Sequence, residues 1–178
     1  MVAGKARLGN VISWLLGRHP DPGQEMGYRS GTLATHQIVG LGTASAICAD
    51  NMAEAQERVQ ALRDRFWAHL KQVPGTQLHG VESPRLAGNL NVGFADVDGE
   101  TLIMALDDVA AANGSACNST SVRPSHVLLA MGVPEDIAHA SLRFTFGRFT
   151  TEEEVDFAAS RVADVVGRLQ ARKGAAAS

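Results

Sequence analysis

The residue best suited to covalent chemistry is Cys117, which stands in the run Asn113-Gly114-Ser115-Ala116-Cys117-Asn118-Ser119-Thr120-Ser121. Its neighbours are small and polar, which favours a loop with an accessible thiol. A thiolate on such a loop can travel between two sites, provided that a nearby cation lowers its pKa. A lone cysteine is a weak signal, so an ordinary loop thiol stays open as an interpretation. The other cysteine, Cys48, lies in an apolar stretch, and we expect it to be a buried packing residue.

Two further positions are suited to binding anions. Arg143 alternates with apolar residues, and the period of two places it on the opposite face of a strand from them. An arginine on a rigid strand suits bidentate binding of a carboxylate, although a solvated strand face is the alternative. Thr32 closes the run Tyr28-Arg29-Ser30-Gly31-Thr32 before an apolar stretch. Hydroxyls and free N–H groups there can hold a phosphate, and the alternative is a plain N-cap.

Composition excludes several classes of protein. The chain has 178 residues and a formal net charge of −3, with no long basic run, which argues against a nucleic-acid partner. Its two cysteines cannot build a disulfide framework, and the six histidines show no metal-ligand spacing. No apolar run is long enough for a membrane-spanning helix, and the N-terminal apolar run is too short for a typical signal peptide. We therefore expect a protein of a reducing compartment, the cytoplasm.

The elements that would position these residues are helices interleaved with short strands. Residues 33–47 predict a buried helix, and a long amphipathic helix follows from Asn51 to Pro74. We expect strands at 76–79, 90–94, 110–113 and 142–146. Asp98, Pro124 and Thr151 each open a helix, the last through a Thr-Glu-Glu-Glu capping box, and a turn follows Pro134. The predicted core is Leu90, Val92, Phe94, Leu142, Phe144, Phe146, Val155, Val162 and Leu169.

This order of elements predicts an α+β fold, a small antiparallel sheet covered by helices and joined to the rest by a long connecting helix. We expect four segments along the chain. Residues 1–22 form an unmatched N-terminal segment, residues 23–50 a remnant of a large domain, residues 51–173 a small domain with the Cys117 loop, and residues 174–178 a frayed tail.

Three blocks, read in order, resemble a known family. They are Arg29-Ser30-Gly31-Thr32 with His36-Gln37-Ile38-Val39-Gly40; Gly114-Ser115-Ala116-Cys117 with Pro124-Ser125-His126-Val127-Leu128; and Ser141-Leu142-Arg143-Phe144 with Gly147-Arg148-Phe149-Thr150-Thr151-Glu152-Glu153-Glu154. Together they are similar to the C-terminal half of NifS/IscS-type cysteine desulfurases, which are homodimeric fold-type I, class V enzymes that use pyridoxal 5'-phosphate. The resemblance runs from about residue 23 to residue 172.

The resemblance implies a role for each candidate residue. Cys117 matches the nucleophile that takes sulfur from L-cysteine as a persulfide and passes it to acceptors such as an iron–sulfur scaffold protein. As the persulfide carrier, Cys117 is also a possible shared ligand of an iron–sulfur cluster. Arg143 matches the residue that pairs with the substrate carboxylate. Thr32 matches the residue that reaches the cofactor phosphate of the partner subunit.

The sequence departs from the family pattern upstream of Arg29. The family's Schiff-base lysine lies there in a Ser-His-Lys stretch, whereas the lysines of this chain are Lys5, Lys71 and Lys173. The family's ring-stacking His, its pyridinium-pairing Asp and its Gln near the phenolic oxygen have no counterparts. We therefore expect a truncated or frame-shifted desulfurase, or one completed by a separate N-terminal half, that is inactive by itself. The alternative is a non-enzymatic persulfide carrier or dimerisation remnant that uses Cys117 without the cofactor; a Cys–His hydrolase has no motif to support it.

Overall fold

The structure is a computed structural model that describes residues 32–113 and 124–176. The chain divides between Asp50 and Asn51 into two units, and the second holds the sheet and most of the helices. No helix in the described part of the chain is long and apolar enough to cross a bilayer.

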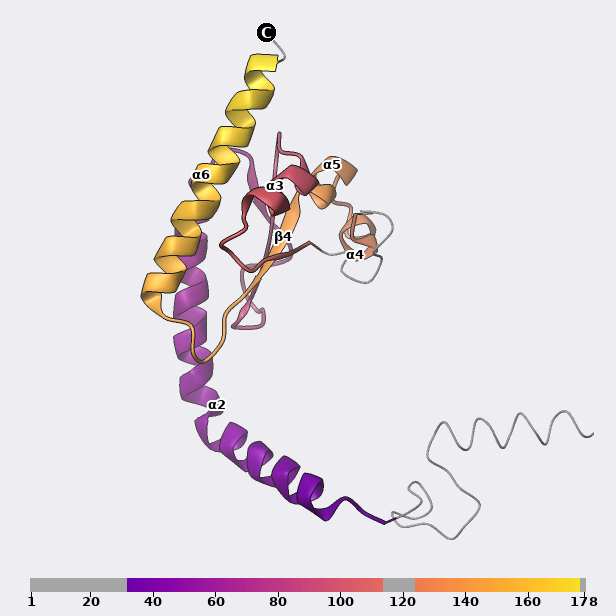
Figure 1. The fold of residues 1–178 in the computed structure, drawn as a ribbon, viewed down its shortest axis with the longest axis vertical. Helices are drawn as coiled ribbons and strands as arrows, with labels where there is room; N and C mark the ends of the chain where they lie inside the picture. The colour runs from indigo at the N-terminus through magenta and orange to yellow at the C-terminus, as the bar shows by residue number, and fades with distance from the viewer. Residues whose placement is uncertain (1–31, 114–123, 177–178) are drawn as a thin grey trace, which may run out of the picture. The chain divides into compact units, whose positions relative to one another are not determined.

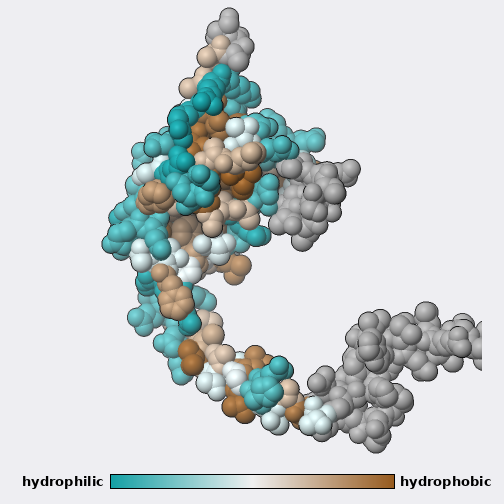
Figure 2. Space-filling view, in the orientation of Figure 1, coloured by the Kyte–Doolittle hydropathy of each residue, from teal (hydrophilic) through white to brown (hydrophobic). Residues whose placement is uncertain are grey.

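Helix α2 runs from Thr35 to Leu70 without a break. It therefore replaces, as one continuous helix, the two helices that the sequence predicts over residues 33–47 and from Asn51 onward. The predicted burial of residues 33–47 is wrong, because every residue from 35 to 54 is exposed. Val39 is 67% exposed and Leu41 71%, and Figure 2 shows hydrophobic residues open along this part of the helix. Cys48 is exposed as well, so its predicted packing role is also wrong. The physical reason is that no described segment covers this half of α2, although its composition is apolar.

The sheet belongs to the second unit and contains four antiparallel strands in the order β1-β2-β4-β3. Their bounds are β1 Thr76–Leu78, β2 Asn89–Phe94, β3 Ala112–Asn113 and β4 Ser141–Thr145. In the central pair, Leu90 lies opposite Phe144 and Asn91 opposite Arg143. All four predicted strands are therefore confirmed, and the third is shorter than expected.

One face of the sheet packs against the second part of α2 and against α6, Glu152–Ala176 (Figure 1). The ring of Phe66 from α2 lies 4.8 Å from that of Phe144 and 5.3 Å from that of Phe146. The predicted core is confirmed, with Leu169 only partly buried. On the surface of this layer, Arg65 of α2 donates to Asp156 and to Glu152 of α6. The hydrogen bond from Arg65 lowers the pKa of Asp156.

Short helices with recognisable ends cover the rest of the unit. They are α3 Gly99–Ala105, α4 His126–Ala130 and α5 Glu135–His139. Asp98 caps α3 by accepting from the N–H of Thr101 at 2.8 Å, as predicted. The capping box is also confirmed, since the Thr151 N–H donates to Glu154 and the Glu154 N–H donates to Thr151 Oγ1. The turn predicted after Pro134 is the short helix α5.

The C-terminal end also differs from the prediction. Helix α6 continues through Gly174 to Ala176, so the tail predicted from residue 174 is helical for its first three residues. Alanine is the best helix former, which favours this extension. Residues 177–178 lie outside the described residues.

Candidate active site

Arg143 lies on the face of the sheet opposite to the helix layer. In β4, Leu142 and Phe144 are buried whereas Arg143 and Thr145 are exposed, as the alternation predicts. The Arg143 guanidinium makes no hydrogen bond or ion pair with the described residues, so its five N–H donors are open to a ligand. Because β4 is a central strand, paired on both edges, the backbone that carries Arg143 is fixed.

Arg143 has one polar neighbour across the sheet. Asn91 of β2 lies directly opposite it on one side, and Ala112 of β3 on the other. Side chains directly opposite each other in an antiparallel pair have Cβ atoms about 4.5–5.5 Å apart. The Oδ1 atom of Asn91 is buried and accepts no hydrogen bond. A buried acceptor without a donor is costly, so Asn91 offers an unused carbonyl beside the open guanidinium of Arg143.

A polar cluster lies beside Arg143 and Asn91. The Nε2 atom of His79 lies 2.8 Å from Ser141 Oγ, and the same hydroxyl donates to the Ile137 carbonyl at 2.6 Å. The hydroxyl hydrogen is thus committed to Ile137, so His79 Nε2 carries the proton and donates to Ser141. Burial lowers the pKa of His79, which keeps its ring neutral. His79 therefore holds the edge strand against β4 and is not free to act as a general base.

Gly93 makes room for that cluster. It lies opposite Ser141 in the sheet, and a Cβ placed on it would meet His79 Nε2 at 2.7 Å and Ser141 Oγ at 3.0 Å. Only glycine leaves space for the histidine to reach across β2 to Ser141. The sequence carries no signal for this contact, because it joins residues 62 positions apart.

Of the three predicted site residues, Arg143 is the one that the described part of the second unit contains. Cys117 lies outside the described residues, so the structure does not test its predicted roles as nucleophile and metal ligand. Thr32 is exposed and belongs to the first unit. Among residues 32–113 and 124–176, no three His, Cys, Asp or Glu side chains gather as a metal site.

By themselves, the residues that the structure describes do not fit a pyridoxal phosphate group, which needs an amine beside the substrate site. Within the described part of the chain the lysines are Lys71 and Lys173. Lys173 Nζ pairs with Asp96 at 3.0 Å, from the end of α6. Lys71 lines a pocket with Leu78 and Leu90, on the helix side of the sheet. Both amines are therefore on the helix side, whereas Arg143 projects from the opposite face.

Comparison with known proteins gives a consistent result. The sequence model of the family described as aminotransferase class-V matches residues 20–157. The chain is 53% identical over 148 residues to the cysteine desulfurase IscS of Pseudomonas aeruginosa strain LESB58, and 51% identical over 148 residues to that of Aeromonas hydrophila. These matches cover 83% of this chain and 37% of each relative, so the chain spans little more than a third of their length.

Solved structures agree with the sequence comparison. A NifS-like protein superposes with a TM-score of 0.69 and 28% identity, over 84% of this chain and 38% of that one. The structure of DndA from Streptomyces lividans superposes with a TM-score of 0.53 and 36% identity, over 70% of this chain and 35% of that one. The α+β architecture of the described residues is thus the architecture of part of these proteins.

Proposed function

Because the chain belongs to the aminotransferase class-V family, we propose that it is the substrate-binding and sulfur-accepting part of a cysteine desulfurase. The observation that carries the proposal is the open guanidinium of Arg143 on a rigid central strand, within a chain 53% identical to an IscS desulfurase. Family members use pyridoxal 5'-phosphate, whose lysine the described residues do not supply. The proposal therefore assigns to this chain only the steps that its own side chains perform.

Arg143 binds the α-carboxylate of L-cysteine. A guanidinium presents parallel N–H donors that match the two oxygens of a carboxylate, and such charge-assisted pairs are among the strongest hydrogen bonds in proteins. The strand fixes the backbone of Arg143, so its side chain alone loses freedom when the substrate binds. The amino acid is thereby held by the end that does not react.

Cys117 accepts the sulfur. The Cys117 thiolate attacks the sulfur of the substrate, so that an S–S bond forms as the bond between that sulfur and the substrate β-carbon breaks. The electron pair of the broken bond stays on the β-carbon, and the one proton given up by the Cys117 thiol completes the methyl group of alanine. Cys117 follows β3 by four residues, and Asn113 of β3 pairs with Leu142, the neighbour of Arg143. A fully extended chain spans about 3.3–3.6 Å per residue, so four residues reach at most about 14 Å. This covalent tether keeps the thiol within reach of a substrate held by Arg143.

The remaining assignments follow from the family. Thr32 contacts the cofactor phosphate of a partner subunit in a homodimer. The persulfide is delivered to an iron–sulfur scaffold protein or another sulfur acceptor in the cytoplasm, where a thiol stays reduced. Through its persulfide, Cys117 would be a shared ligand of the iron–sulfur cluster during that delivery.

A chimaera tests the proposal. The 148-residue segment of the Pseudomonas aeruginosa relative is replaced by the matching residues of this chain, and the chimaera is supplied with L-cysteine. We expect alanine to form and a persulfide to appear at Cys117 by mass spectrometry; Cys117→Ser abolishes the persulfide, and Cys48→Ser does not. Arg143→Lys raises KM for cysteine about tenfold or more, because lysine cannot bind bidentately, whereas the exposed control Arg172→Lys leaves KM unchanged. A folded chimaera that forms alanine without a persulfide at Cys117 would contradict the proposal.

The second candidate is a persulfide carrier that uses Cys117 without pyridoxal phosphate. The placement of Lys71 and Lys173 on the far side of the sheet from Arg143 favours it for the chain by itself. We expect that pyridoxal phosphate added to the purified chain leaves no aldimine absorbance after the excess is removed, and no adduct after borohydride. A retained band that maps to one lysine would show that this chain supplies its own amine.

A further inference from the structure

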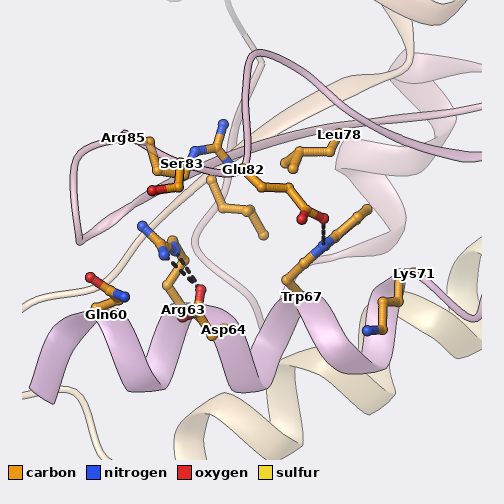
Figure 3. A pocket seen from close by; sticks show the side chains of 10 residues that line it. Gln60, Arg63, Asp64, Trp67, Lys71, Leu78, Glu82, Ser83 and Arg85 are labelled. Carbon is orange, nitrogen blue, oxygen red and sulfur yellow. Dashed lines mark hydrogen bonds and ion pairs between the residues drawn. The ribbon is translucent and has the colours of Figure 1, made fainter. Parts of the chain in front are cut away.

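A polar pocket of about 330 Å³ lies between α2 and the segment that joins β1 to β2 (Figure 3). Leu78 and Leu90 form part of its wall. Leu90 pairs with Phe144, whose ring packs on Phe66 of α2, so the pocket lies on the helix side of the sheet. Arg143 projects from the other face, and the pocket is therefore separate from the candidate active site.

The floor of the pocket carries a buried arginine. The side chain of Arg63 is only 6% exposed. Its Nε and Nη2 atoms donate to Asp64 Oδ1 at 2.9 and 2.6 Å, and its Nη1 atom donates to the Leu86 carbonyl at 3.1 Å. A guanidinium has five N–H donors, so these bonds leave two of them unused. An enclosed cation with spare donors favours an anionic ligand.

A second arginine enters from the facing wall, as Figure 3 shows. Arg85 Nη2 donates to the His79 carbonyl at 2.7 Å, which fixes the direction of its side chain and leaves its other donors open. Burial, followed by the charge of Arg63, lowers the pKa of Arg85. Two guanidinium groups thus repel each other across one enclosure, and an anion placed between them would remove that repulsion.

The other charges of the pocket leave room for such an anion. Lys71 is a third cation at its wall, against the two carboxylates of Asp64 and Glu82. Asp64 is engaged by Arg63, and Glu82 Oε1 accepts from the Trp67 indole at 3.3 Å. Asp64 thus pairs with Arg63 and leaves two of the Arg63 donors unused, and Glu82 is directed to Trp67. The three cations exceed the two carboxylates by one charge, and the indole of Trp67 offers an apolar surface beside them.

We propose that this pocket binds a small molecule through an oxyanion, a phosphate monoester or a carboxylate, held between Arg63 and Arg85 with its organic part against Trp67. A volume near 330 Å³ is at the lower end of the range for small-molecule sites, about 300–1,000 Å³, and exceeds what a free inorganic anion fills. Planar, bidentate donors suit both head groups. The site is independent of the sulfur chemistry proposed above.

Fluorescence of Trp67 reports the binding. In the full chain carrying Trp14→Phe, Trp67 is the remaining tryptophan. We titrate this protein at constant ionic strength with phenyl phosphate, benzoate, inorganic phosphate and phenol. We expect a saturable change in emission with phenyl phosphate or benzoate, whichever head group the site prefers, weaker binding of inorganic phosphate, and no saturation with phenol.

Matched variants locate the site. Arg85→Gln should raise Kd tenfold or more, whereas Arg168→Gln, which removes the same charge from an exposed position on α6, should leave Kd unchanged. Lys71→Glu breaks none of the hydrogen bonds of the pocket and should raise Kd several-fold by charge alone, which keeps the test valid if Arg85→Gln unfolds. Absence of saturation with both aromatic anions would overturn the proposal. So would a Kd that Lys71→Glu and Arg85→Gln change no more than Arg168→Gln.

Discussion

Replacing Gly93 by alanine should destabilise the sheet unit through a contact that the sequence alone does not reveal. The new Cβ would meet Ile137 Cγ2 at 2.6 Å, His79 Nε2 at 2.7 Å and Ser141 Oγ at 3.0 Å. All three residues are buried, so none can retreat into solvent. Overpacking of this kind costs about 1–3 kcal/mol, and loss of the His79–Ser141 hydrogen bond about 0.5–1.5 kcal/mol. We therefore expect the free energy of unfolding to fall by about 2–4 kcal/mol.

Gly167→Ala is the matched control, with the opposite sign expected. Gly167 is exposed within α6, and a Cβ there meets nothing within 4 Å. Alanine stabilises a helix interior over glycine by about 0.5–1 kcal/mol. Urea unfolding, followed by circular dichroism on both variants and on the parent chain, measures the two changes. A Gly93→Ala protein within about 0.5 kcal/mol of the parent would refute the packing of His79 over Gly93.

Three further changes test the core, the buried histidine and the exposed helix. Phe144→Ala should lower the free energy of unfolding by about 3–5 kcal/mol, because Phe144 is 4% exposed. Phe149 is 82% exposed, and Phe149→Ala should lower the free energy of unfolding by less than about 0.5 kcal/mol. If urea unfolding gave the same loss for both variants, the burial of Phe144 in the core would be contradicted. The pKa of His79 is lower in the folded protein than in the unfolded chain, so as the pH falls the imidazole of the unfolded chain is protonated before that of the folded protein. The contribution of the neutral ring to stability is therefore full above pH 6.5 and declines as the pH falls from 6.5 towards the pKa of the folded state. His79→Gln should flatten that part of the stability profile, and an unchanged slope would argue against a buried neutral ring. Cys48 should react with a maleimide in the native protein, since it is exposed, and peptide mapping that finds it protected would contradict this.

Local patterns predict much of the sheet unit correctly. The alternation of Leu142, Arg143 and Phe144 places each side chain on its observed face, because a strand has a strict period of two. The caps at Asp98 and Thr151 are equally local, since a side-chain oxygen reaches an N–H group three residues ahead. These features depend on neighbours within one element, which the sequence displays directly.

Other features depend on partners that the sequence does not identify. Apolar composition predicts burial of residues 33–47, but burial needs a second surface, and no described segment supplies it. The site shows the same limit: Asn91 alternates within its own strand, yet nothing in the sequence pairs it with Arg143 across 52 positions. Arg63 is buried beside Leu62, the residue that the periodicity of the helix predicts for the core. Its burial is possible because Asp64 and the Leu86 carbonyl accept hydrogen bonds from three of its five N–H donors.

The strand order has a consequence for synthesis of the chain. Strand β4 pairs with both β2 and β3, although it follows both in the sequence. A nascent polypeptide that ends before Ser141 therefore holds the β1–β2 hairpin alone, and a two-stranded hairpin is at best marginally stable in water. Until β4 and then α6 leave the ribosome, Leu90, Val92 and Phe94 lack the part of their covering layer that α6 provides, and the edge of β2 is open to other chains. The sheet unit therefore completes its fold only after its last strand and last helix have been translated.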